Sequence, residues 1–185
     1  MKTDFNAGRH PVRILLLAGG LFASVCVSAH EPVQQPSFAI AVQDELASAA
    51  AGVTDLKFRE FFKLPIGPRG LEPSEKLVSL VGKRVRLVGY MARQENPTPG
   101  FFVLSPLPVT LGDEDESLAD DLPASVIYVH AAASEGRPLP YYSGLLRLTG
   151  TLSLGAFEES DGRVSSVRMQ LDPKLTQAMA AQPSK

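Results

Sequence analysis

The chain has 185 residues, a formal net charge of −2 at pH 7 and one cysteine. A negative balance argues against broad electrostatic binding of nucleic acid, which needs a basic surface. The only cysteine, Cys26, lies near the start of the chain, so core packing alone must hold the rest of the fold together.

Residues 1–29 carry the pattern of a secretory signal peptide. Three basic residues precede an apolar run at 14–27, and the small-residue sequence Val-Ser-Ala at 27–29 follows. The run is shorter than the ~20 residues that a membrane-spanning helix needs. We therefore expect cleavage of this leader and a periplasmic product that begins at His30.

Removal of the leader would leave 156 of the 185 residues, which is enough for one domain. Three of the 18 basic residues and one of the 20 acidic residues would leave, so 15 and 19 would remain, a net charge of −4. Cys26 would leave as well, which excludes thiol chemistry in the product. Lipid attachment at Cys26 is less expected, because Val25 stands where lipoprotein signals place a small residue.

The sequence before residue 63 predicts a polar N-terminal region followed by short helices. Residues 30–37 are polar and proline-rich, and 38–51 are rich in Ala, Leu and Glu. Residues 55–62 mix charged and apolar side chains at helical spacing, with Thr54 as a candidate N-cap. We expect the phenylalanines of this segment to plug an open end of the following sheet or to pack on it.

A turn rich in proline and glycine at 65–70 then forbids a continuing helix. The sequence Pro73-Ser74-Glu75 is a suitable start for one more short helical turn. Leu77 and Leu80 would lie on its inner side.

From Gly82 onward the apolar period changes to two, which is typical of half-buried strands. Gly89 and Gly150 interrupt two of the runs, and we expect bulges or sharp bends there. Asp161-Gly162 is expected at a hairpin turn. The strand-like runs are 82–91, 101–105, 125–131, 145–154 and 164–171.

Five short strands with glycine-marked bends favour a small barrel of the oligonucleotide/oligosaccharide-binding (OB) type. The segment 80–91, LVGKRVRLVGYM, resembles the first strand of small exported bacterial proteins of unknown function with an OB-fold-like barrel. Residues 101–106 resemble their second strand and 146–154 a later strand with a glycine-containing bend, and the similarity covers residues 55–172. Related sequences can carry a cysteine-rich patch after the second strand, where this chain has Pro108-Val109-Thr110-Leu111-Gly112, so no thiol or metal role is carried over.

This resemblance implies a mainly β (α+β) fold, a five-stranded antiparallel OB-like barrel preceded by short N-terminal helices. The expected organisation is a signal peptide (1–29), a polar and helical N-terminal segment (30–53), the barrel domain with its preceding helix (54–172) and a polar C-terminal tail (173–185).

Two groups of side chains are candidates for binding a ligand or partner. On an OB-fold, the basic and aromatic first strand could accept nucleic acid or sugar, although the expected compartment and charge argue against nucleic acid. Alternatively, this strand simply faces solvent. The sequence Pro-Leu-Pro-Tyr-Tyr at 138–142 suits a partner-docking loop, or the tyrosines belong to the core. The candidate residues are Arg84, Arg86, Tyr90, Arg93, Tyr141 and Tyr142.

Metal binding is a second hypothesis. A terminal His30 could chelate copper through its amino group and imidazole, with His130 as a third nitrogen ligand. The acidic residues at 113–121, Asp113 and Asp115 among them, could bind calcium weakly. They lack the spacing of an EF-hand loop, so a solvated loop is the simpler interpretation.

No sequence signature of an enzyme is present, because the chain has no nucleophile elbow, phosphate loop or dinucleotide fingerprint. We expect a non-enzymatic periplasmic binding or adaptor domain with no cofactor. Its partner would be an unidentified envelope protein or small ligand, in service of an envelope transport or assembly system. The alternative is a periplasmic metal-binding accessory protein.

Overall fold

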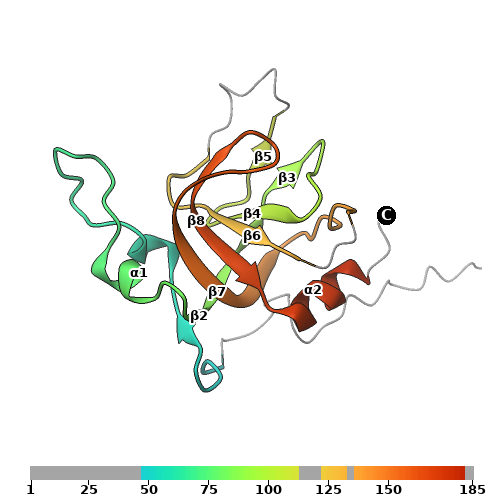
Figure 1. Ribbon diagram of the computed structural model, residues 1–185, viewed down its shortest axis with the longest axis horizontal. Helices are drawn as coiled ribbons and strands as arrows, with labels where there is room; N and C mark the ends of the chain where they lie inside the picture. The colour runs from blue at the N-terminus through green and yellow to red at the C-terminus, as the bar shows by residue number, and fades with distance from the viewer. Residues whose placement is uncertain (1–46, 113–121, 133–135, 182–185) are drawn as a thin grey trace, which may run out of the picture. The chain divides into compact units, whose positions relative to one another are not determined.

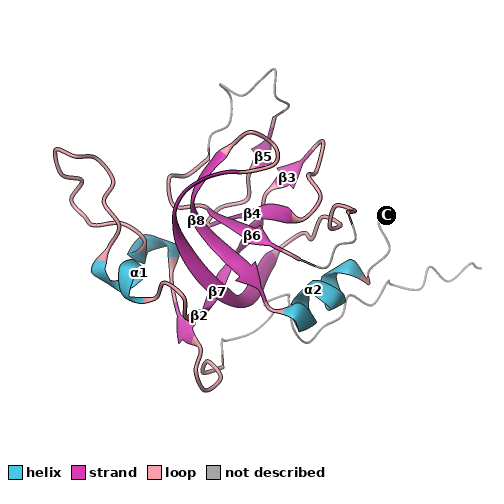
Figure 2. Ribbon diagram, viewed as in Figure 1, coloured by secondary structure: helices cyan, strands magenta, loops and turns pink. Residues whose placement is uncertain are grey.

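The structure, a computed structural model, describes residues 47–112, 122–132 and 136–181 (Figure 1). The expected leader and residues 38–46 of the helical segment expected at 38–51 lie outside these ranges, and residues 47–51 form no helix. The described residues form a mainly β fold, as the period-two pattern predicts, with two α-helices (Figure 2). None of the described helices is long and apolar enough to span a membrane.

Six strands form one mixed sheet in the order β1-β2-β4-β6-β8-β7, and β2 also pairs with β7. The pairings of β2, β4, β6, β8 and β7 therefore close into a ring of hydrogen bonds. A separate pair, β3–β5, is parallel. The strands are β1 (Thr54–Asp55), β2 (Arg84–Met91), β3 (Arg93–Gln94), β4 (Phe101–Ser105), β5 (Thr110–Leu111), β6 (Ile127–His130), β7 (Leu145–Glu158) and β8 (Val164–Leu171).

The expectation of a wholly antiparallel sheet is wrong at two pairings. β1 runs parallel to β2, and β6 runs parallel to β8. The physical reason for the second is geometric: a closed ring with an odd number of strands cannot reverse direction at every pairing. A ring of five strands must therefore contain at least one parallel pair.

The two faces of β4 pack into two different apolar clusters. Phe102 and Leu104 face the main core, together with the buried leucines of β2 and β7 and the last apolar residues of β8. Phe101 and Val103 face the other way and pack with Tyr128 in a smaller cluster. Burial on both faces explains why this strand is apolar from Phe101 to Leu104 and shows no alternation.

Of the two alternatives expected at Gly89 and Gly150, a bulge is wrong at both residues. The β2–β7 ladder runs through both residues without a change of register. Each glycine instead lies where a neighbour comes very close, with the Phe58 ring next to Gly89 and the Met169 side chain next to Gly150. The irregularity of β7 falls between Leu154 and Phe157.

The segment at 55–62 is not the predicted helix. Its start is β1, and only a single 3-10 turn, η1 (Phe58–Glu60), follows. The backbone amide of Leu56 donates to the carbonyl of Arg86 in β2, so strand pairing competes with helix formation here. Phe58 and Phe61 are buried in the main core, which confirms that the segment packs against the sheet.

The short helix after Ser74 is confirmed as α1 (Glu75–Ser79). Ser74 is its N-cap, and its Oγ accepts a hydrogen bond of 3.0 Å from the amide of Leu77. The hairpin turn at Asp161-Gly162 is confirmed as well, because the amide of Glu159 donates to the carbonyl of Arg163 across it.

The polar tail predicted from residue 173 contains a second helix, α2 (Pro173–Ala180), with proline in its first turn. Thr176 and Met179 are buried, whereas the other residues of the helix are exposed or half-buried. The Tyr142 hydroxyl donates a 2.8 Å hydrogen bond to the carbonyl of Met179, which fixes the end of the helix against the fold.

Candidate functional site

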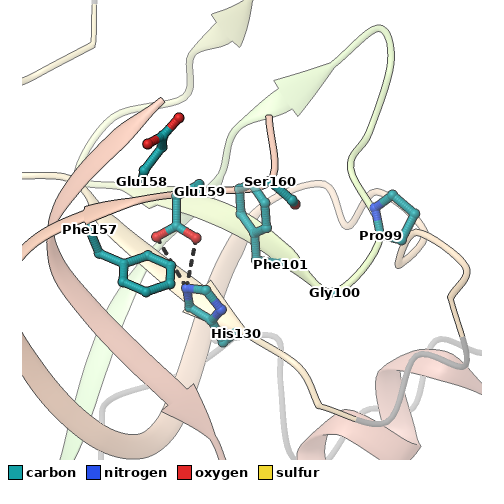
Figure 3. Close-up of a pocket in the computed structure, with 8 residues that line it drawn as sticks. All are labelled: Pro99, Gly100, Phe101, His130, Phe157, Glu158, Glu159 and Ser160. Atoms are coloured by element: carbon teal, nitrogen blue, oxygen red, sulfur yellow. Dashed lines mark hydrogen bonds and ion pairs between the residues drawn. The ribbon is translucent and has the colours of Figure 1, made fainter. Parts of the chain in front are cut away.

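A pocket of about 520 Å³ lies where the β2–β4 loop, the end of β6 and the β7–β8 turn meet, and we call it the His130 pocket (Figure 3). A second pocket of about 460 Å³ shares Pro99, Gly100 and His130 with it. The residues that line the His130 pocket are Pro99, Gly100, Phe101, His130, Phe157, Glu158, Glu159 and Ser160.

His130 is held in this pocket by a buried carboxylate. Its Nε2 lies 3.3 Å from both carboxylate oxygens of Glu159, whose side chain is only 2% exposed. Ser165 Oγ donates a 2.5 Å hydrogen bond to the same carboxylate. The oxygens of a carboxylate accept hydrogen bonds, so Nε2 of His130 is the donor to Glu159, and Nδ1 is the other nitrogen of the ring.

Aromatic rings form the apolar part of the pocket. The Phe101 ring stacks on His130, with 5.6 Å between centroids and 28° between planes. Phe157 is 51% exposed. The guanidinium carbon of Arg168 lies 4.5 Å from its ring centroid. The pocket thus offers a fixed polar edge next to exposed aromatic surface.

The candidate arginines of β2 take part in ion pairs instead of lining this pocket. Arg84 is exposed and pairs with Asp172 at the start of α2. Arg86 is 8% exposed, and its Nε and Nη2 donate to the two oxygens of Asp55 at 2.5 and 2.8 Å. Arg86 therefore has little surface left for a ligand. Tyr90 is half-buried on the same strand.

Replacement of Asp55 by asparagine is expected to remove an acid-sensitive part of the stability. The hydrogen bonds from Arg86 lower the pKa of Asp55 below its ordinary value of 3.8. A lowered folded-state pKa stabilises the fold above pH 3.8, and this contribution is lost as the pH falls through the folded-state pKa.

The measurement is the urea midpoint of the wild type and Asp55→Asn at neutral pH and near pH 2. The variant should be less stable at neutral pH. The difference between the two urea midpoints should close in acid, as the wild-type carboxyl becomes protonated. An equal gap at both pH values would show that the pair does not act through the charge of Asp55.

The two candidate tyrosines have different environments. Tyr142 is buried, and burial raises its pKa to about 12. Tyr141 is 50% exposed, and the Arg93 guanidinium lies 5.8 Å from its ring centroid. The structure therefore brings Arg93 and Tyr141 together on the surface, while Tyr142 belongs to the core.

Of the four predicted metal ligands, only His130 falls in the described ranges; His30, Asp113 and Asp115 lie outside them. Within 47–112, 122–132 and 136–181, no cluster of three or more His, Cys, Asp or Glu side chains is placed to hold a metal ion. His130 lines the pocket with one carboxylate partner.

Sequence reasoning missed Glu159, Phe157 and Phe101 as site residues. Glu159 stands in a run of charged turn residues, which predicts exposure, yet it is buried. The pairing of β7 with β8 changes register between Leu154 and Phe157, shortly before this residue. The period-two pattern of the sequence gives no signal of that shift, so sequence alone could not identify Glu159.

The sequence matches no family model, and it matches no curated protein. Among solved structures, the chain has a structural match to a DUF3299 family protein from Pseudomonas aeruginosa. The match has a TM-score of 0.42 and 15% sequence identity, and it covers 63% of this chain and 91% of that one.

Proposed function

We propose that the protein is a non-enzymatic binding domain that takes a small ligand in the His130 pocket and acts in the periplasm as an accessory to an envelope system. The observation that carries the proposal is the buried Glu159, which holds His130 in a pocket lined by exposed aromatic surface. Burial of a carboxylate is costly, so a fold that places one behind a histidine favours a functional role for the pair.

The pocket has the chemistry for a neutral or cationic ligand with one flat apolar face. Nδ1 of His130 accepts a hydrogen bond from a ligand hydroxyl or amine, and the exposed Phe157 ring packs against its apolar face. Glu158 and Glu159 both line the pocket. Their negative charge disfavours phosphates and other anions.

The strand order supports an OB-like barrel as the framework of this binding site. β2, β4, β6, β8 and β7 close into a five-stranded ring, and the loops before β4 and β8 both reach the pocket. OB-folds bind their ligands on the face of the second and third strands of the barrel. The loops between the first and second strands and between the fourth and fifth strands also contact the ligand. We infer that the His130 pocket occupies that position.

A binding role is favoured over catalysis because His130 lacks a hydrogen-bonded nucleophile among the described residues. In the part of the chain that the structure describes, no hydroxyl or amine is hydrogen-bonded to the His130 ring; Ser165 bonds to Glu159 instead. A histidine base needs a reacting group within hydrogen-bond reach. The periplasmic setting rests on the leader pattern of residues 1–29.

Replacement of Phe157 by alanine is expected to weaken ligand binding about tenfold, because the exposed ring supplies the apolar contact. The measurement is an NMR titration with N-acetylglucosamine, arginine and inorganic phosphate as neutral, cationic and anionic probes. The amides of Gly100 and Ser160 should shift with the neutral or the cationic probe and not with phosphate.

Tyr141→Ala is the matched control, because Tyr141 and Phe157 are 50% and 51% exposed and only Phe157 lines the pocket. The control should bind as the wild type does. If no probe shifts the pocket amides, or if both variants bind equally weakly, the proposed pocket is wrong. Signals of a reaction product in the titration would contradict the non-enzymatic role.

A further inference from the structure

The segment from Phe62 to Pro73 forms a small hairpin that projects next to α1 (Figure 1). A bridge joins Phe62 to Pro73 at its base, and a second bridge joins Gly67 to Gly70 at its tip. Between them the amide of Lys63 donates a 2.9 Å hydrogen bond to the carbonyl of Glu72. The hairpin thus has an ordered backbone although little of it is buried.

Three apolar side chains of this hairpin are exposed. Leu64, Ile66 and Leu71 are 74%, 60% and 42% exposed. Leu64 and Ile66 lie on the first arm and Leu71 on the second, between the bridge at the base and the bridge at the tip. The hairpin therefore presents apolar side chains from both of its arms to solvent.

The exposed apolar residues of the fold concentrate in this region. Nine large hydrophobic residues are exposed among the described residues, and five of them fall between 64 and 81. The other two of these five are Val78 and Val81, in and just after α1. Single exposed apolar residues are ordinary, whereas a concentration of them indicates an interaction surface.

The hairpin also carries charged side chains. Glu72 pairs with Arg69 at 2.7 Å and with Lys63 at 3.7 Å, and both cations remain well exposed. The surrounding sequence is basic: residues 57–83 hold six Lys and Arg against three Asp and Glu, in a chain whose net charge is −2. A local excess of cations therefore accompanies the exposed apolar residues.

We propose that this hairpin docks the protein on an anionic phospholipid surface, inserting Leu64, Ile66 and Leu71 between the headgroups. Peripheral membrane elements combine an apolar face with cations that contact the headgroups, which is the composition found here. The local positive charge distinguishes a lipid surface from an apolar groove of a neutral or basic protein. This surface is independent of the His130 pocket.

The test is co-sedimentation with vesicles of phosphatidylglycerol or of phosphatidylcholine. All variants are purified in the same processed form, with the N-terminus read by mass spectrometry, so any contribution of the residues before 47 is common to them. The wild type should sediment with phosphatidylglycerol and much less with phosphatidylcholine. Leu64→Ser/Ile66→Ser should bind phosphatidylglycerol at least about tenfold more weakly.

The matched control is Leu107→Ser/Val164→Ser, which changes two residues that are 60% and 64% exposed and lie elsewhere in the chain. It should bind as the wild type does, and the melting temperatures of both double variants should stay close to the wild-type value. The proposal is overturned if the wild type binds neither kind of vesicle or binds both equally. It is also overturned if the control loses as much binding to phosphatidylglycerol as the hairpin variant does. A hairpin variant that changes only the oligomeric state would show an interface between copies instead.

Discussion

Replacement of Gly150 by alanine is expected to destabilise the fold by about 3 kcal/mol, as overpacking of a close backbone contact does. A Cβ at this position would press on the carbonyl oxygen of Gln170 and lie 2.6 Å from Cγ of Met169. The first obstacle is backbone in the β7–β8 ladder, so no side-chain rotation can relieve the clash. The measurement is the free energy of unfolding from urea denaturation.

Gly67→Ala is the matched control. A Cβ on Gly67 would meet nothing within 4 Å, and its backbone does not require a positive φ. Its effect should stay within about 0.5 kcal/mol of the wild type. Equal losses from the two substitutions would show that the closeness of β7 and β8 is not what makes glycine necessary at 150.

Replacement of Phe61 by alanine is expected to cost about 4 kcal/mol, the usual range for a buried phenylalanine. Phe61 is 0% exposed, and its ring lies 5.3 Å from that of Phe58 and 6.4 Å from that of Phe62. Its truncation would open a cavity between the sheet and the segment in front of it. Thermal or urea unfolding measures the loss.

Phe62→Ala is the control in the same segment, because Phe62 is only partly buried against the same core. Its cost should be about half that of Phe61→Ala or less. The comparison asks whether the region before β2 is an integral part of the core. If Phe61→Ala is as stable as Phe62→Ala, the sheet does not depend on the region before β2 for its stability.

Much of the β structure could be predicted from local pattern. β4 and β8 begin and end at the predicted residues, and the short helix begins after Ser74 as expected. Strand period, capping and turn chemistry act over a few residues, so sequence alone carries them. The helix expected at 55–62 does not form because Asp55 and Leu56 pair with β2, a strand about 30 residues later.

The candidate site was harder to predict than the strands. Of the residues singled out in the sequence, His130 alone lines the pocket, and it was singled out as a metal ligand. Arg86 was selected for its charge, but its buried side chain forms an ion pair with the exposed Asp55. Glu159 was overlooked because its burial depends on how β7 and β8 turn around it.

The sequence by itself determined the β class of this domain, the positions of its main strands, and the turns at Ser74 and Asp161-Gly162. Each of these depends on interactions between residues that are close along the chain. Only the tertiary structure decided the parallel β6–β8 pair, the ion pair of the buried Arg86 with Asp55, and the contact of His130 with Glu159. These features arise when distant strands close into a ring. The local sequence around each residue does not indicate which distant residue it will contact.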